Sequence, residues 1–298
     1  MSVVISDAWR QRFGGTARLY GEKALQLFAD AHICVVGIGG VGSWAAEALA
    51  RTGIGAITLI DMDDVCVTNT NRQIHALRDN VGLAKAEVMA ERIRQINPEC
   101  RVTVVDDFVT PDNVAQYMSV GYSYVIDAID SVRPKSGADC LLSAHKIPLV
   151  TTGGAGGQID PTQIQVTDLA KTIQDPLAAK LRERLKSDFG IVKNSKGKLG
   201  VDCVFSTEAL VYPQSDGTVC AMKATAEGPK RMDCASGIWR GDDGDRHLWF
   251  CCGFSCAEED DGESGPSGVN NQVGCDANVL SDLVQCLNLL RHSDNRLA

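Results

Sequence analysis

A glycine-rich turn at residues 37–42, Gly-Ile-Gly-Gly-Val-Gly, constrains the fold of this chain more than any other feature. Residues 32–36 before it, His-Ile-Cys-Val-Val, are mostly apolar and β-branched, which predicts a buried strand. Residues 43–50 after it are rich in alanine and predict a helix. A strand, a glycine turn and a helix in this order surround a phosphate with backbone N–H groups and a helix N-terminus. The predicted nucleotide contacts in this turn are Gly37, Gly39, Gly40 and Gly42.

A second predicted strand, residues 56–60, ends at Asp61, whose carboxylate is placed to accept hydrogen bonds from a ribose. Strand-like and helix-like segments continue to alternate as far as residue 150. The expected strands are residues 101–105, 124–129 and 147–150, and the expected helices are residues 16–29, residues 82–96 and a short one from Pro111. This alternation predicts an α/β fold with a doubly wound, parallel sheet.

The chain changes in character at a glycine loop, residues 152–157. Asp175 and Pro176 predict the start of an amphipathic helix, because Asp is a good N-cap and Pro suits the first turn. Residues 190–200 are polar and lysine-rich, which favours a loop. Short strands are expected at residues 163–166, 201–205 and 209–211.

Polar residues that follow Asp61 favour contacts to a triphosphate. Asn69, Arg72 and Gln73 stand close together, and Arg is able to grip phosphate oxygens with a bidentate fork. Lys85, at the start of the next predicted helix, supplies a second cation. A dehydrogenase needs only the acidic residue for its ribose, so this cluster argues for transfer at phosphorus.

Two carboxylates, Asp127 and Asp130, follow the strand predicted at residues 124–129. The carboxyl edge of a parallel sheet faces the ligand crevice, so one of them is placed to hold Mg²⁺ beside the phosphates. In the alternative interpretation, Arg72 and Lys85 form surface ion pairs and Asp127 caps the strand end.

The net charge of −9 is unevenly distributed. Residues 237–298 hold 11 acidic residues against 4 arginines, whereas residues 171–200 hold 8 basic residues against 3 acidic ones. Such a basic belt is able to neutralise the phosphates of a nucleic acid, although a solvated helix face and a lysine-rich loop explain it equally well. The candidate nucleic-acid contacts are Lys171, Lys180, Arg182, Arg184, Lys193, Lys196 and Lys198.

The cysteine pattern and the hydropathy of the chain indicate its cellular compartment. None of the 12 cysteines stands in a paired C-x-x-C arrangement, so no structural zinc site is predicted. No apolar run approaches the roughly 20 residues that cross a bilayer, and the N-terminal residues do not form a signal peptide. We therefore expect a cytoplasmic protein with reduced thiols.

The chain resembles the ubiquitin-activating/MoeB/ThiF superfamily, and within it the TcdA (CsdL) branch of tRNA threonylcarbamoyladenosine dehydratases. The likeness covers residues 2–135 and 146–236. The motifs that carry it are the glycine turn, residues 59–63, Asn69, Arg72, Gln73, Lys85, residues 127–130, residues 153–162, the lysine loop and residues 201–208. It implies a Rossmann-like, mostly parallel sheet with a C-terminal antiparallel portion.

The resemblance implies that ATP and Mg²⁺ are the cofactors. Gly39 and Gly42 would approach the phosphates, Asp61 would bind the ribose and Asp130 would hold Mg²⁺. The implied catalytic set is Arg72, Lys85 and Asp130, with Cys234 as a weaker candidate; Gly37, Gly40, Asp63, Asn69 and Gln73 are further nucleotide contacts.

The implied activity is ATP-dependent cyclisation of N6-threonylcarbamoyladenosine beside the tRNA anticodon. The carboxylate of the modification attacks the α-phosphorus, pyrophosphate leaves and an acyl-adenylate forms. The urea-like group then attacks the activated carbonyl, AMP departs and a ring closes. The alternatives are adenylation of a sulfur-carrier protein as in MoeB and ThiF, a nicotinamide dehydrogenase, and a non-catalytic sulfur-transfer scaffold.

The resemblance also implies partners. A tRNA is the substrate, a homodimer is expected, CsdE and CsdA are candidate sulfur-transfer partners, and no DNA is expected. Relatives use an N-terminal arginine that reaches into the partner subunit's site, for which Arg12 and Arg18 are candidates. Cys234 is either a thiolate of lowered pKa or an ordinary thiol, and Cys203 is expected in the core.

Two segments, residues 136–145 and 237–298, depart from the pattern of the resemblance. In the first, Gly137 is a poor helix former where a crossover helix is expected. The second segment is acidic and cysteine-rich, whereas the resemblance implies an apolar tail at this position. Peripheral membrane association would be expected only with that apolar tail. We interpret both as out-of-frame translation, with a genuine acidic tail as the alternative. The expected organisation is an adenylating domain at residues 1–236, with a nucleotide half at about 1–150 and a substrate half at about 151–236, and the tail at 237–298.

Overall fold

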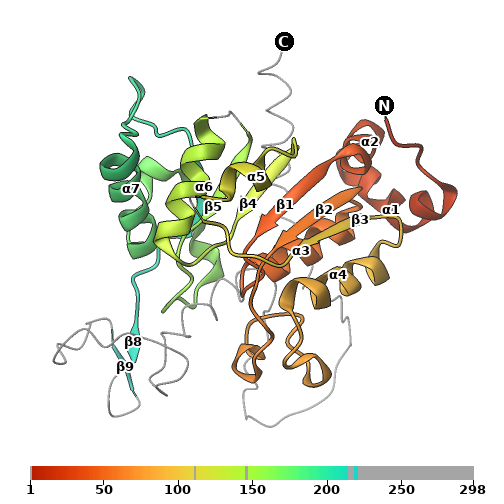
Figure 1. Cartoon of the computed structure of the whole chain (residues 1–298), viewed down its shortest axis with the longest axis horizontal. Coiled ribbons are helices and arrows are strands. Elements are labelled where there is room, and N and C mark those ends of the chain that lie inside the picture. Colours follow the sequence, from red (N-terminus) through yellow and green to blue (C-terminus); the bar gives the residue numbers. More distant parts are fainter. Residues whose placement is uncertain (1, 111, 145–146, 214–217, 221–298) are drawn as a thin grey trace, which may run out of the picture.

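The computed structural model describes residues 2–110, 112–144, 147–213 and 218–220. These residues fold around a seven-stranded sheet with the strand order β3-β2-β1-β4-β5-β7-β6, and a separate pair is formed by β8 and β9 (Figure 1). The strands of the large sheet are β1 (His32–Val36), β2 (Ala56–Ile60), β3 (Arg101–Val105), β4 (Tyr124–Asp127), β5 (Leu149–Thr152), β6 (Ile164–Asp168) and β7 (Asp202–Ser206). The separate pair consists of β8 (Tyr212–Pro213) and β9 (Val219–Cys220).

The topology is doubly wound. From β3 to β7 every neighbouring pair of strands is parallel, whereas β6 runs antiparallel to β7 at the edge. The chain leaves β1 for β2 and β3 on one side and returns to β4 on the other side. The order therefore reverses between β1 and β4, which opens a crevice at the carboxyl ends of these strands. The predicted α/β fold is confirmed, including its antiparallel portion.

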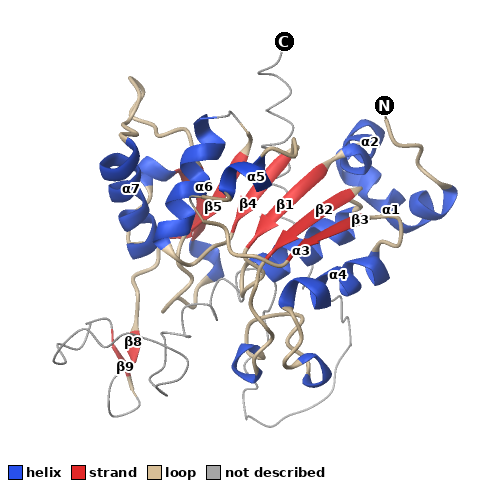
Figure 2. Cartoon of the chain, in the orientation of Figure 1, coloured by secondary structure: helices blue, strands red, loops and turns tan. Residues whose placement is uncertain are grey.

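Helices cover both faces of the sheet (Figure 2). On one face lie α2 (Glu22–Asp30), α3 (Gly42–Thr52) and α4 (Lys85–Ile96), and on the other lie α5 (Val114–Met118), α6 (Val132–Ala144) and α7 (Pro176–Phe189). The N-terminal helix α1 (Asp7–Tyr20) packs on α2 through Trp9 and Phe13. The short 3-10 helices are η1 (Val67–Asn69), η2 (Arg78–Asn80), η3 (Pro161–Gln163) and η4 (Leu169–Lys171).

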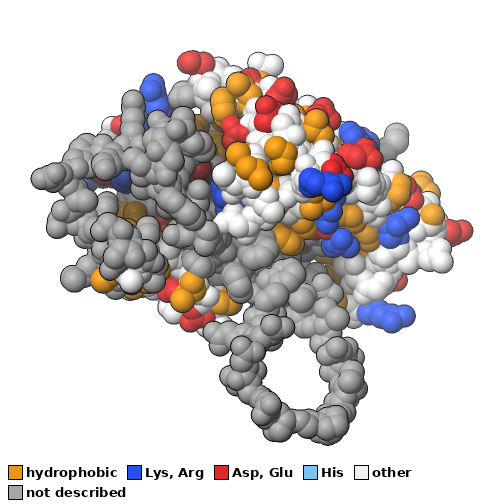
Figure 3. Space-filling view, turned by 90° about the horizontal axis from the view of Figure 1, so that it is seen from below, with side chains coloured by type: hydrophobic (Ala, Val, Ile, Leu, Met, Phe, Trp, Pro, Cys, Tyr) orange, Lys and Arg blue, Asp and Glu red, His pale blue; other side chains and the backbone are white. Residues whose placement is uncertain are grey.

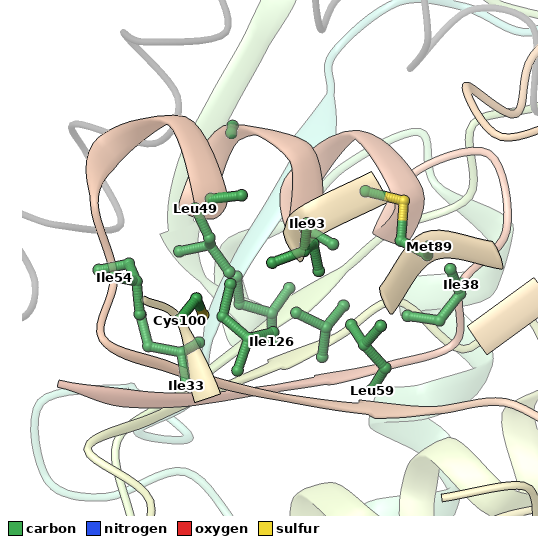
Figure 4. Close-up of a cluster of buried hydrophobic side chains, with 14 of the residues drawn as sticks. Ile33, Ile38, Leu49, Ile54, Leu59, Met89, Ile93, Cys100 and Ile126 are labelled. Atoms are coloured by element: carbon green, nitrogen blue, oxygen red, sulfur yellow. The ribbon is translucent and has the colours of Figure 1, made fainter. Parts of the chain in front are cut away.

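The central strand explains the two-sided core. Ile33 and Val35 of β1 point into one hydrophobic cluster, and Cys34 and Val36 point into the other. Successive strand residues alternate between faces, so a strand covered on both sides must be apolar throughout. Figure 4 shows the first cluster, in which strand residues such as Ile33, Leu59 and Ile126 meet Leu49 of α3 and Ile93 of α4. The predicted burial of Cys203 is also confirmed.

Two predictions of local structure were wrong, and one expected helix forms against its local propensity. The helix predicted at residues 16–29 is two helices, because Gly21 adopts a φ of 86° between α1 and α2. Residues 136–139 lie within α6, so tertiary packing outweighs the poor helix propensity of Gly137. The strand predicted at residues 209–211 is displaced to β8.

The described surface carries mixed chemistry. Figure 3, a view from below, shows hydrophobic, acidic and basic side chains interspersed over the described part of that face. None of the helices in the described ranges is long and apolar enough to cross a bilayer. Cys234 and the tail at residues 237–298 lie outside the described residues.

Candidate nucleotide site

A cavity of about 630 Å³ opens where β1, β2, β4 and β5 end. The carboxyl ends of parallel strands converge at the point of strand-order reversal, which is where doubly wound sheets bind ligands. Every nucleotide contact predicted from the sequence lines this cavity, with the exception of Gly42, and Asp130 lines it as well. Residues far apart in the chain are thus brought to one place.

The glycine turn has a separate steric reason at each of three positions. Gly37 adopts a φ of 85°, and a Cβ atom there would lie 2.9 Å from the carbonyl oxygen of Ala128. A Cβ atom on Gly42 would lie 1.8 Å from the carbonyl oxygen of Gly37, so Gly42 allows α3 to begin directly behind the turn. A Cβ atom on Gly39 would meet nothing within 4 Å and would occupy space at the cavity wall. The prediction that Gly42 itself touches the ligand stays a prediction.

The N-terminus of α3 is suited to an anion. Its N-cap residue, Val41, makes no side-chain hydrogen bond to the first turn of the helix. The first N–H groups of a helix have no partners within the helix, and they carry the positive end of its dipole. Gly39, Gly40 and Val41 line the cavity beside this end, so a phosphate there would be met by backbone donors.

Asp61 is fixed by the backbone around it. One carboxylate oxygen accepts a hydrogen bond from the N–H group of Ile38, and the other accepts one from the N–H group of Asp63 at 2.8 Å. Burial raises the pKa of Asp61, although the charge of Lys85 and the two N–H donors oppose the shift. Asp61 thus ties the end of β2 to the glycine turn, with its side chain at the cavity wall.

Two cations approach the cavity from the segment between β2 and α4. The side chain of Lys85 is 8% exposed, and its Nζ lies 2.8 Å from the Asp63 carboxylate. The residue Arg72 is 7% exposed, and its Nη1 donates to the carbonyl oxygen of Thr68 and to the side chain of Asn71. Lys85 forms an ion pair, as the alternative interpretation expects, but both cations are buried at the wall of a cavity and are not displayed on the surface.

Asn69 and Gln73 support the loop that carries Arg72. The side-chain oxygen of Asn69 accepts a hydrogen bond from the N–H group of Cys66. The backbone carbonyl oxygen of Asn69 accepts hydrogen bonds from the N–H groups of Arg72 and Gln73. The indole of Trp44 on α3 donates to the carbonyl oxygen of Arg72. These bonds hold the Arg72 loop against the helix that begins at the glycine turn.

The structure separates the two candidate metal carboxylates. Asp127 is fully buried in an ion pair with Lys135, whereas Asp130 is exposed and lines the cavity. Among the described residues, no group of three or more His, Cys, Asp and Glu side chains could hold a metal. Asp130 nevertheless fits Mg²⁺, which is commonly bound by one or two carboxylates together with substrate phosphates and water.

Residues 15–222 of the chain match the model of the ThiF family. This chain belongs to the ThiF family. It is 95% identical over 238 residues to the tRNA threonylcarbamoyladenosine dehydratase of Escherichia coli (strain K12). The aligned region covers 80% of this chain and 89% of that protein.

Two solved structures of ThiF-type chains hold nucleotides. The crystal structure of the E. coli enzyme in complex with ATP has a TM-score of 0.70 and 95% identity, and the match covers 71% of this chain and 87% of that chain. The crystal structure of the same enzyme in complex with AMP has a TM-score of 0.71, with coverage of 72% and 88%.

Parts of this ThiF-type cavity have no counterpart in the sequence predictions. Residues 152–156, at and beyond the end of β5, line the cavity, as do Phe108 and Val109 after β3. The glycine loop is a clear motif in the sequence, but the motif alone does not predict a role at the cavity. The rule that ligands bind beyond the carboxyl ends of strands would have included both segments, because each directly follows a predicted strand.

The basic residues of the belt, residues 171–200, differ in exposure and in their contacts. Lys171, Lys180, Lys193, Lys196 and Lys198 are exposed. In contrast, Arg182 donates to the carbonyl oxygens of Leu169 and Thr172 and thereby joins α7 to η4, and Arg184 pairs with Asp188 at 2.9 Å. Arg12 and Arg18 lie on α1 and do not line the cavity.

Proposed function

We propose that this protein is an ATP-dependent dehydratase that cyclises N6-threonylcarbamoyladenosine next to the anticodon of tRNA. The observation that carries the proposal is the cavity, in which a glycine turn, a ribose-placed carboxylate and two buried cations converge. A 95% identical relative is named for this reaction, and structures of such relatives hold ATP and AMP.

The first chemical step is attack of the threonylcarbamoyl carboxylate on the α-phosphorus of ATP, which releases pyrophosphate and leaves an acyl-adenylate. The N–H groups at the start of α3 bind phosphate oxygens, and Asp61 accepts hydrogen bonds from the ribose hydroxyls. Arg72 and Lys85 stabilise the negative charge that develops on phosphorus and on the leaving group. Mg²⁺ held by Asp130 would neutralise phosphate charge.

Ring closure follows in the same cavity. The urea-like group of the modification attacks the activated carbonyl, and AMP leaves as a ring forms. This step needs no nucleophile from the protein, because the two reacting groups belong to one substrate and are held close together.

The tRNA contact is assigned to the exposed lysines of the basic belt, which supply positive charge for the phosphate backbone. Arg182 supports this surface by joining α7 to η4, and Arg184 pairs with Asp188 on the same helix. A homodimer with Arg12 or Arg18 reaching the partner's cavity, an association with CsdE/CsdA-type proteins and a cytoplasmic location complete the proposal.

Exchange of labelled pyrophosphate into ATP tests the proposal. Arg72→Ala or Lys85→Ala is expected to lower the exchange rate about 100-fold, because each removes a preorganised donor for the transition-state charge. Lys23→Ala, an exposed lysine on α2, serves as the matched control and should retain the rate. Exchange that requires a sulfur-carrier protein instead of modified tRNA would contradict the proposed substrate.

A further inference from the structure

A fully buried ion pair lies behind the nucleotide cavity and takes no part in the chemistry described above. The side chains of Asp127, at the end of β4, and Lys135, on α6, are both 0% exposed. The Nζ atom of Lys135 lies 3.0 Å from Oδ2 of Asp127 and donates, also at 3.0 Å, to the backbone carbonyl oxygen of the same residue. One ammonium group therefore holds both the side chain and the main chain at the point where β4 ends.

The neighbouring strand completes this attachment. The hydroxyl of Thr151 donates to Oδ2 of Asp127 at 3.2 Å, and the hydroxyl of Thr152 donates to its carbonyl oxygen at 3.3 Å. The remaining carboxylate oxygen of Asp127 accepts a hydrogen bond from the N–H group of Ile129. Asp127 thus joins β4, β5, α6 and the loop that follows β4.

That loop is part of the cavity wall. Residues 128–131 line the cavity, and Asp130 within them is the residue assigned to Mg²⁺. The carbonyl oxygen of Ala128 also lies where a Cβ atom on Gly37 would be only 2.9 Å away, so the loop abuts the glycine turn. A shift of the backbone at Asp127 would therefore move both the carboxylate and the turn.

Stability alone does not account for this pair. Desolvation of two charges commonly cancels their attraction, and well-packed apolar side chains of similar size are often as stable or more so. What apolar side chains would not provide is the directional bond from an ammonium group to the carbonyl oxygen of Asp127. The pair is thus suited to fixing a backbone position.

We propose that Lys135 is a positioning residue that holds residues 127–131 in the conformation needed to bind ATP, an inference that rests on the proposed function. It touches neither the nucleotide cavity nor any reacting group, and it acts through Asp127. Its other titratable neighbours are the buried carboxyls of Asp139, on α6 itself, and Asp175, at the start of α7.

The experiment compares three variants with the unaltered protein. Lys135→Met alone leaves the Asp127 carboxylate buried without a counter-ion and is expected to unfold at a lower temperature. The double variant Asp127→Asn/Lys135→Met is uncharged at this position, so its melting temperature should return to within a few degrees of the original. Lys23→Met makes the same chemical change on the exposed surface of α2 and serves as the control.

Binding of ATP to the free protein, measured by calorimetry well below the melting temperature, is the deciding readout. The double variant is expected to bind ATP at least tenfold more weakly than the unaltered protein and the Lys23→Met control, despite its restored stability. A merely structural pair would predict normal affinity once folding is restored, and that result would overturn the inference.

A milder variant covers the case in which the double variant does not fold. Thr151→Val removes one hydrogen bond to Asp127 with little change in shape, and it is expected to weaken ATP binding about threefold. Unchanged ATP affinity in this variant would also overturn the inference. Because binding is measured without tRNA, a protein that binds ATP but does not cyclise its tRNA substrate would contradict the proposed function and leave this inference standing.

Discussion

At the scale of single residues, Asp139 is a carboxyl group whose burial costs the folded state free energy. It is 0% exposed on α6, and no donor meets either carboxylate oxygen with hydrogen-bond geometry, although the Asp127 carboxylate and the Thr151 hydroxyl lie beside it. Burial and the negative charge of Asp127 hold its pKa well above the usual range, against the opposing effect of Lys135. A buried polar group without a partner costs free energy that an apolar side chain would not.

We predict that Asp139→Leu stabilises the protein by about 2 kcal/mol at pH 7. The raised pKa means that the folded state holds the proton more tightly than the unfolded state. The contribution of Asp139 is thus fully present below the unfolded pKa of about 3.9 and is lost as pH rises toward the folded value. The gain from the substitution should therefore grow between pH 4 and pH 7, as measured by urea unfolding.

Asp139→Asn is the matched control for that measurement. It removes the ionisation and keeps an unpaired polar group, so it should stabilise less than Asp139→Leu while abolishing the pH dependence. A gain that is equal at pH 4 and pH 7 would contradict the assignment of the cost to ionisation. The separate hypothesis of out-of-frame translation at residues 136–145 and 237–298 is tested by resequencing the coding DNA across both segments; an unbroken, unaltered reading frame would contradict it.

At the scale of elements, hydrogen bonds hold the lysine segment, residues 190–200 between α7 and β7, in a defined turn. The side chain of Asn194 accepts hydrogen bonds from the N–H groups of Lys196 and Lys198. Asp168, at the end of β6, accepts from the N–H groups of Leu199 and Gly200. The segment therefore displays its lysines from a defined turn whose base is tied to the sheet.

We predict that the triple variant Lys193→Ala/Lys196→Ala/Lys198→Ala binds tRNA more weakly and with less sensitivity to salt. Each lysine that neutralises a phosphate adds about 0.7 to 0.9 to the slope of log affinity against log salt, so the slope should become shallower by about 2. Filter binding between low and moderate salt measures this slope. ATP affinity should stay normal, because none of these lysines lines the cavity. An unchanged slope would show that this segment does not bind the tRNA backbone.

At the scale of the whole molecule, the cavity joins the two sides of one sheet. The glycine turn and the Arg72 loop come from the β1–β3 side, and residues 152–156 come from the β5 side. A ligand that contacts both sides must bind the folded state far better than the unfolded chain. Such a ligand stabilises the whole fold by mass action.

We therefore predict that ATP at 100 times its dissociation constant raises the free energy of unfolding by about 2.7 kcal/mol. Thermal melting with and without ATP measures the effect as an upward shift of the midpoint. Arg72→Ala, tested at the same ATP concentration, should show a smaller shift because its affinity is lower. An equal shift in both proteins would argue against Arg72 as a phosphate ligand.

Much of this architecture was predictable from local patterns. The order of strands and helices, the glycine turn, and the placement of Asp61, Arg72 and Lys85 around one cavity follow from hydrophobic periodicity and from the rule that ligands bind at carboxyl strand ends. These features depend on residues close together in the chain or on a general topology. The position of Gly21 between two helices was missed, because a glycine with positive φ is not distinguishable in sequence from one within a helix.

The sequence by itself determined a doubly wound α/β fold and the chemical character of its ligand, because both arise from short-range patterns of apolar, glycine and charged residues. The family resemblance singled out Asp130, but only the tertiary structure shows why this carboxylate, and not Asp127, faces the cavity. Asp127 and Asp130 stand three residues apart and look equivalent in sequence, yet Lys135 and Thr151 bury the first and leave the second exposed. That choice depends on contacts between β4, β5 and α6, whose geometry no local pattern specifies.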